Sequence, residues 1–202
     1  MDKPTLIIIN GLSATGKSTL IDRITSEFHL PIFSMDVVKE YLFDELGTDD
    51  TEWSAALGKS SRGLIYMSAK EVLAVGQSCI VEGLFEPEEN KKNIEYIQKS
   101  ASCNLIQIIC TADNAERIQR WNDRVKSGDR HPGHNDEILT GENYVNALEA
   151  CDPVVPLEAP LLCYRSDAED AEGELNSLIS ALKELLGCHL LRLDLLIILI
   201  QA

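Results

Sequence analysis

The residues with the clearest chemical meaning lie near the start of the chain. Residues 11–18 read Gly-Leu-Ser-Ala-Thr-Gly-Lys-Ser and match the pattern G-x-x-x-x-G-K-[ST] in full, between a strand-like run and a helical pattern. The N–H groups of such a phosphate loop wrap a phosphate, its lysine reaches the β- and γ-phosphates, and its last hydroxyl binds Mg²⁺. We therefore predict a nucleotide site with Lys17 as a catalytic group and Ser18 as the Mg²⁺ ligand. The predicted nucleotide contacts are Gly11, Ser13, Ala14, Thr15, Gly16, Lys17, Ser18 and Thr19.

Other motifs narrow the kind of reaction. GTPases add a base-reading Asn-Lys-x-Asp, whereas Asn90-Lys91-Lys92-Asn93 lacks the Asp. The strand-like run before Gly83 ends in Glu82, where a Walker B strand ordinarily ends in Asp. At 202 residues the chain is also short for a motor or AAA+ ATPase with a sensor domain. These features favour ATP as the nucleotide and a compact kinase as the class of enzyme.

A cluster of basic residues lies farther along the chain, at residues 117–130. It holds five basic side chains (Arg117, Arg120, Arg124, Lys126, Arg130) against two acidic ones (Asp123, Asp129), a net charge of +3. The first three arginines share one helical face, and Ser127-Gly128-Asp129 then breaks the helix. Guanidinium groups neutralise the charge of a phosphoryl group in transfer, and a mobile arginine loop can exclude water. We predict an arginine lid over residues 117–134.

Within this lid we expect different roles for the arginines. Arg124 and Arg130 are predicted to contact phosphates during catalysis, and Arg120 and Arg124 to bind the nucleotide. For Arg117, which follows Glu116 directly, we expect a solvated helix face instead.

These side chains must be positioned by a regular framework. Apolar runs bounded by turn residues predict buried strands, and residues with helical spacing lie between them. The alternation predicts a three-layer α/β fold with one five-stranded parallel sheet and helices on both faces. Residues 36–76 form a mostly helical insertion, opened in part by a cap at Asp49-Asp50-Thr51, which we expect to be a small acceptor lobe. The predicted strands are Thr5–Asn10, Pro31–Ser34, Cys79–Glu82, Asn104–Cys110 and Pro160–Tyr164, and the helices include Ser18–Phe28, Asn114–Lys126 and Glu172–Leu186.

Three motifs together carry a family resemblance: the phosphate loop, Ser34-Met35-Asp36, and the arginines that lead into Arg130-His131-Pro132-Gly133-His134. The chain resembles the P-loop small-molecule kinases, a group that includes gluconate, shikimate and adenylylsulfate kinases, chloramphenicol phosphotransferase and zeta toxins. Within that group it is similar to the predicted-kinase branch often labelled AAA family ATPase. The resemblance covers about Pro4 to Leu186, so residues 1–187 are expected to be one P-loop kinase domain. It implies transfer of the γ-phosphoryl group of ATP to a hydroxyl of a small molecule.

The resemblance also implies roles for two carboxylates. Asp36 would face the phosphate loop as general base or acceptor contact, although its position also suits the N-cap of a helix over Val37–Phe43. Glu82 would bind Mg²⁺ through water or contact the acceptor. The alternative for Glu82 is an exposed carboxylate at a strand end.

The remaining site candidates are weaker. His131 could contact phosphate or acceptor and His134 is expected to be structural, because Pro132-Gly133 makes a turn and no third metal ligand is near. Residues 164–167 follow the last strand, where the group packs adenine, but Ser166 or Asp167 could equally cap the final helix. Candidates for acceptor selection in the lobe are Lys39, Trp53, Lys59 and Arg62.

Composition bounds the partners. The net charge of −15 and a pI near 4.6 argue against extended nucleic acid or an anionic membrane surface as partner. Thiols inside apolar runs (Cys79, Cys110, Cys163), and the lack of a signal layout or membrane-spanning window, favour a cytoplasmic protein. The apolar C-terminal tail, residues 188–202, could dock on the core or on a second subunit, making a homodimer, or could anchor at an interface. The tail, together with Glu82 in place of the usual Walker B Asp, is also consistent with an alternative function: a regulatory ATP-hydrolysing module that acts through a protein partner.

Overall fold

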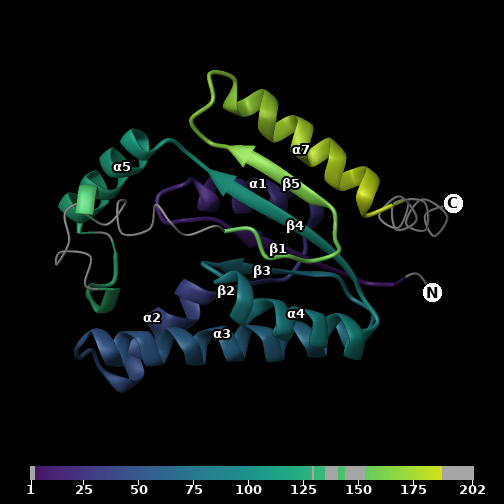
Figure 1. The fold of residues 1–202 in the computed structure, drawn as a ribbon, viewed down its shortest axis with the longest axis horizontal. Coiled ribbons are helices and arrows are strands. Elements are labelled where there is room, and N and C mark those ends of the chain that lie inside the picture. The colour runs from purple at the N-terminus through teal and green to yellow at the C-terminus, as the bar shows by residue number, and fades with distance from the viewer. Residues whose placement is uncertain (1–2, 129, 135–140, 144–152, 188–202) are drawn as a thin grey trace, which may run out of the picture.

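Five parallel strands form one sheet at the centre of the molecule (Figure 1). The computed structural model describes residues 3–128, 130–134, 141–143 and 153–187. The strand order is β2-β3-β1-β4-β5, and every neighbouring pair is parallel. The predicted α/β class and five-stranded sheet are therefore confirmed. The strands are β1 (Thr5–Asn10), β2 (Ile32–Ser34), β3 (Cys79–Gly83), β4 (Asn104–Thr111) and β5 (Leu161–Arg165).

Helices cover both faces of the sheet, with α1 and α7 on one side and α3 and α4 on the other (Figure 1). The side chains of β1 alternate accordingly: Ile7 and Ile9 join the cluster with α1 and α7, while Leu6 and Ile8 join the other. Both faces being buried explains why β1 reads as an unbroken apolar run. The helices are α1 (Lys17–Phe28), α2 (Met35–Leu46), α3 (Thr51–Ala74), α4 (Pro87–Ala101), α5 (Asn114–Ser127) and α7 (Ala171–Leu185), with a 3₁₀ turn at Pro132–His134.

Two helix caps differ from the sequence prediction. Ser34 caps α2, because its hydroxyl accepts from the Val37 N–H, so Asp36 lies in the first turn of the helix and is not its cap. Asp170 caps α7 through the Gly173 N–H, and neither Ser166 nor Asp167 does so. The predicted cap of α3 is correct, since the Asp50 side chain accepts from the Trp53 N–H at 2.8 Å.

Burial corrects one further expectation. Cys79 and Cys110 are buried, but Cys163 is exposed because β5 is an edge strand with its outer face open to solvent. Helix α4 was not anticipated at all from the sequence. Across the described ranges, no helix combines the length and apolarity needed to span a membrane. The tail at 188–202, and the homodimer predicted through it, lie outside the described residues.

The parallel arrangement brings the carboxyl ends of the strands to one edge of the sheet. The phosphate loop follows β1 there, Ser34 ends β2, and Glu82 lies near the end of β3. The register pairs Glu82 with Ile9 on one side and with Ser34 on the other. Ligand sites of open parallel sheets form at such an edge.

Candidate functional site

The phosphate loop has the close backbone approach that its glycines allow. A Cβ on Gly11 would lie 2.4 Å from the Cys110 carbonyl oxygen of β4, which leaves no room for a side chain. Gly16 has a φ of 84°, and a Cβ there would lie 2.7 Å from the Ser166 side chain. Both positions thus require glycine for steric reasons.

Asn10 secures the entrance of the loop and was missed by the sequence prediction. Its fully buried side-chain oxygen accepts from the N–H groups of Gly11 (2.8 Å) and Phe85 (3.0 Å), while its amide donates to the carbonyls of Phe85 and Pro153. The amide thereby ties the start of the loop to the segment after β3. The available signal was a polar side chain ending an otherwise apolar strand.

Two arginines of α5 hold the loop from the other side. Arg117 is 2% exposed and donates to the Ser13 carbonyl at 3.2 Å, so the predicted solvated position of Arg117 is wrong. Arg120 donates to the carbonyl of Ala14 (3.3 Å) and to the Ser166 hydroxyl (2.7 Å). The arginine spacing defined a helix face correctly, but only the packing of α5 on the loop decides what that face contacts.

Lys17 lies folded back on the loop. Its Nζ donates to the carbonyls of Gly11 (2.9 Å) and Leu12 (3.1 Å). Burial lowers the pKa of Lys17, while the nearby carboxylates of Glu82 and Asp36 oppose that shift. A bound phosphate would replace the two carbonyls as acceptor and restore the favourable environment of the cation.

A cavity of about 430 Å³ opens beside the loop and collects most of the predicted residues. Its lining combines four cations with three carboxylates, and Val37 and Glu40 of α2 were not among the predicted residues. Gly11, Thr19 and His131 are not among the described residues that line it. The lining residues are Ser13, Ala14, Thr15, Gly16, Lys17, Ser18, Ser34, Asp36, Val37, Glu40, Glu82, Arg120, Arg124 and Arg130.

The two predicted carboxylates are both engaged. Glu82 is 7% exposed and accepts from the Ser34 hydroxyl at 2.7 Å, so the reading of Glu82 as an exposed strand end is wrong. Burial raises the pKa of Glu82, with the charge of Lys17 opposing. Asp36 forms an ion pair with Arg130 across 3.2 Å. Arg124, the other lid arginine of the cavity, stacks its guanidinium over Trp121 at 4.7 Å from the ring centroid.

The histidines of the lid loop, residues 130–134, lie against α2. His131 stacks on Phe43 (centroids 5.3 Å apart) and bonds to Asp44, outside the cavity. The side chain of His134 is 4% exposed and bonds to Glu40 and to Arg130, each at 3.0 Å. The lid loop is therefore joined to the lobe by side chains of α2.

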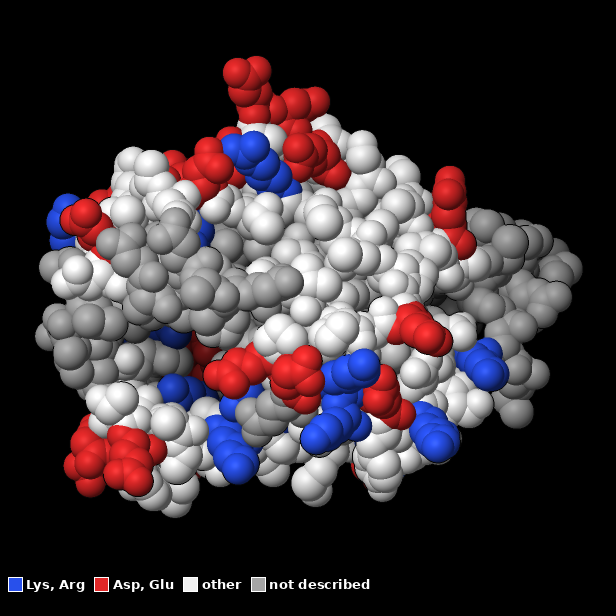
Figure 2. Space-filling view, in the orientation of Figure 1, with Lys and Arg blue, Asp and Glu red and all other residues white. Residues whose placement is uncertain are grey.

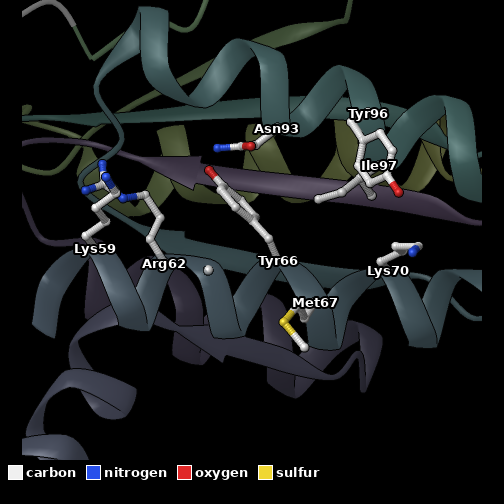
Figure 3. A pocket seen from close by; sticks show the side chains of 9 residues that line it. Lys59, Arg62, Tyr66, Met67, Lys70, Asn93, Tyr96 and Ile97 are labelled. Atoms are coloured by element: carbon white, nitrogen blue, oxygen red, sulfur yellow. The ribbon is translucent and has the colours of Figure 1, made fainter. Parts of the chain in front are cut away.

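The other lobe candidates lie away from the phosphate loop. Lys39 sits over the Phe43 ring and Trp53 donates to the Gly47 carbonyl. Lys59 and Arg62 line a separate cavity of about 430 Å³ between α3 and α4 (Figure 3). The sequence could not place them away from the site, because helical spacing shows which residues share a face but not what that face contacts.

The distribution of surface charge agrees with the acidic composition of the chain. On the face shown in Figure 2, acidic side chains gather over the turn before α7, and basic ones alternate with acidic ones over α3 and α4. The described residues of this face form no broad basic surface. The sheet is parallel and five-stranded, and the phosphate loop follows its central strand. With cations on that loop and carboxylates in the same cavity, these features define a kinase-like P-loop protein.

Comparison with known proteins identifies the family. The family described as an AAA domain matches residues 6–142, and the chain belongs to it. A crystal structure from Chloroflexus aurantiacus J-10-fl, of a protein provisionally identified as a kinase, is 32% identical, with a TM-score of 0.79 over 89% of this chain and 98% of that chain. The predicted kinase-group resemblance is thereby confirmed.

A more distant structure shares the fold alone. Kti12 of Chaetomium thermophilum, in complex with ADP-AlF₃, is 18% identical, with a TM-score of 0.56 over 88% of this chain and 99% of that chain. The comparison with curated proteins found no match.

Proposed function

We propose that the protein transfers the γ-phosphoryl group of ATP to a hydroxyl of a small molecule. One observation carries the proposal: a single cavity brings together the phosphate loop, the carboxylate of Asp36 and the guanidinium groups of Arg124 and Arg130. A phosphoryl-transfer site needs those three parts, a phosphate cradle, a group that orients the nucleophile and cations that neutralise the moving charge. The kinase-like relative supports this choice.

The residues present suit ATP and Mg²⁺. The backbone of the loop and Lys17 would hold the β- and γ-phosphates, with Arg120 beside them at the cavity wall. Ser18 and Glu82 offer hydroxyl and carboxylate oxygens, the donors that Mg²⁺ prefers. Within the described ranges, no group of three His, Cys, Asp or Glu side chains could hold a metal alone, so phosphates and water would complete the shell. Bound Mg²⁺ would neutralise charge on the phosphates.

The chemical step then follows from the groups that line the cavity. Asp36 orients the acceptor hydroxyl and accepts its proton as the oxygen attacks the γ-phosphorus. The bond from the γ-phosphorus to the bridging oxygen breaks, and ADP leaves. Lys17, Arg124 and Arg130 neutralise the charge on the phosphoryl oxygens during transfer.

The lining also favours a class of acceptor. The lining holds three carboxylates, Asp36, Glu40 and Glu82, and one of its cations, Arg130, is already paired with Asp36. An acceptor with a carboxylate or phosphate near its hydroxyl would be repelled there, whereas a neutral or amine-bearing one would not. We infer that the acceptor is a neutral or cationic hydroxyl compound.

The test is an acceptor screen with γ-labelled ATP and compounds matched in shape but not in charge, such as glucose, glucosamine and gluconate. Label is expected in a neutral or amine-bearing product, and Lys17→Ala should abolish it and weaken ATP binding. Preference for the acids would overturn the acceptor class.

If label appears only as free phosphate, whatever acceptor is offered, the kinase proposal is contradicted. That result would support a second candidate function, an ATP-hydrolysing module that acts through a protein partner. The pairing of Asp36 with Arg130 is the observation that favours this alternative, because it occupies the group needed as base.

A further inference from the structure

The lid loop meets α2 in a regular register. Asp36, Glu40 and Asp44 lie one helical turn apart, at i, i+4 and i+8, and so share one face of α2. Each pairs with a different lid-loop side chain: Asp36 with Arg130 (3.2 Å), Glu40 with His134 (3.0 Å) and Asp44 with His131 (3.1 Å). The loop and the helix are about 90 residues apart in sequence, so this match is a product of folding.

The hydrogen-bond chemistry fixes the state of His134. A guanidinium can only donate, so His134 Nδ1 must accept from Arg130 Nη2, and the ring proton must lie on Nε2, where it donates to Glu40. His134 is therefore neutral, in one tautomer. Burial, with Arg130 nearby, agrees with this by lowering the pKa of His134 to about 4.

This chain of contacts sets the position of the Arg130 guanidinium. Glu40 holds the His134 ring, His134 holds Arg130, and the same Nη2 that bonds to His134 reaches Asp36. Both ends of the chain, Glu40 and Asp36, line the cavity beside the phosphate loop, as does Arg130 itself. A guanidinium carries five N–H donors, so it can keep its bond to His134 while other donors turn to a phosphate.

We propose, on the basis of the function proposed above, that His134 and Glu40 are positioning residues that hold Arg130 on Asp36 until a γ-phosphate draws the guanidinium away. The more highly charged phosphate outcompetes one carboxylate for the cation. Asp36 then becomes available to the acceptor hydroxyl only when the phosphoryl group to be transferred is in place. His134 acts as the pivot of this exchange.

A first test reads the side chains directly and needs no turnover. Long-range ¹H–¹⁵N spectra of the nucleotide-free protein at pH 7 should show His134 neutral with its proton on Nε2. A non-hydrolysable ATP analogue with Mg²⁺ should shift the guanidinium signal of Arg130, and ADP with Mg²⁺ should leave it near its nucleotide-free position. A proton on Nδ1, a cationic ring, or equal shifts with both nucleotides would overturn the proposal.

A second test uses kinetics. His134→Leu should lower kcat for phosphoryl transfer, or for ATP hydrolysis where no acceptor is found, by about 10- to 100-fold with little change in KM for ATP, as expected for a misaimed group. His134→Gln should retain most of the wild-type kcat, because its amide can both accept from Arg130 and donate to Glu40. Asp44→Ala removes a lid-loop contact of the same kind, two helical turns from Asp36. Its kcat should stay within about threefold of the wild-type value.

The double variant Arg130→Ala with His134→Leu should be no slower than Arg130→Ala alone, because His134 acts through Arg130. Additive losses, or an equal loss in Asp44→Ala, would assign His134 a general role in lid stability instead. The spectra and ATP hydrolysis do not depend on an acceptor. If the kinase proposal fails, these measurements can therefore still decide whether His134 positions Arg130.

Discussion

Asp36 shows how much a single side chain can depend on its partners. It lies in the first turn of α2, lines the cavity beside the phosphate loop, and is paired with Arg130. A carboxylate in that position can orient a hydroxyl, and its ion pair with Arg130 holds it in place. Substitution of Asp36 therefore tests the proposed chemistry directly.

Asp36→Asn should leave ATP affinity unchanged and lower phosphoryl transfer by about 10²- to 10⁴-fold, because the amide can still accept from Arg130 but cannot take a proton. Nucleotide binding by calorimetry and label transfer from ATP measure the two effects separately. Transfer at the normal rate in this variant would remove Asp36 from the role of base.

His134 predicts a dependence of stability on pH. Burial and the positive charge of Arg130 lower its pKa from 6.5 to about 4, against the smaller opposing effect of Asp36, while Lys39 and His131 add to the lowering and Glu40 faces Nε2. The unfolded chain binds this proton below about pH 6.5 and the folded chain only below about pH 4. The free energy of unfolding therefore decreases as the pH is lowered from about 6.5 to about 4, by about 3 kcal/mol at most.

Urea unfolding at pH 7.0 and 4.5 measures this effect, with His134→Gln as the comparison. The loss of stability between the two pH values should be smaller in the variant, because glutamine does not titrate. The same loss in both proteins would show that other groups are responsible.

At the scale of elements, α2 does more than the sequence suggested. It was expected to form part of an acceptor lobe, and it also supplies the surface on which the lid loop rests, through three carboxylates and Phe43. The approach is close: a Cβ on Gly133 would lie 2.5 Å from the Phe43 ring. The lid loop and α2 are thus packed directly against each other.

Gly133→Ala should disturb that packing. The added methyl must displace the Phe43 ring or the loop, at a cost of about 1–3 kcal/mol, and turnover should fall because Arg130 loses its position. Gly63→Ala is the matched control, since nothing lies within 4 Å of its added Cβ and α3 gains a better helix former. Thermal unfolding and ATP turnover of both variants provide the measurement; equal behaviour would contradict the lid–lobe contact.

At the scale of the whole molecule, charge distribution separates one small site from the remaining surface. The chain carries −15, whereas residues 117–130 carry +3, and three of their arginines line the cavity with Lys17. Positive charge is thereby concentrated where one nucleotide would bind, within a surface that repels polyanions.

Accordingly, the protein should not retain duplex DNA or RNA at physiological salt, even at about 100 µM protein, where basic proteins bind nonspecifically. Mobility shift or fluorescence anisotropy checks this, with ATP binding in the same buffer as the positive control. Measurable binding of polynucleotide that weakens with salt would contradict a small-molecule role.

Features whose geometry is local could be predicted from the sequence. Residues 11–18 form the phosphate loop because their glycines and the helix start lie within eight consecutive positions, and the unbroken apolar run of β1 already required a buried strand. Asp36 was selected through the family resemblance, whereas Arg124 lies on a recognisable helix face and Arg130 on the loop that follows the break at residues 127–129.

Which groups meet across the fold could be seen only once the helices were placed on the sheet. Asn10 at the loop entrance, the buried Arg117 on Ser13, and Lys59 and Arg62 in a separate cavity all depend on how helices pack against the sheet. The pairing of Arg130 with Asp36 joins residues 94 positions apart, and no local pattern encodes such a distance. Spacing along the chain fixes the face of a helix, but the partner of that face is set by the packing of the whole core.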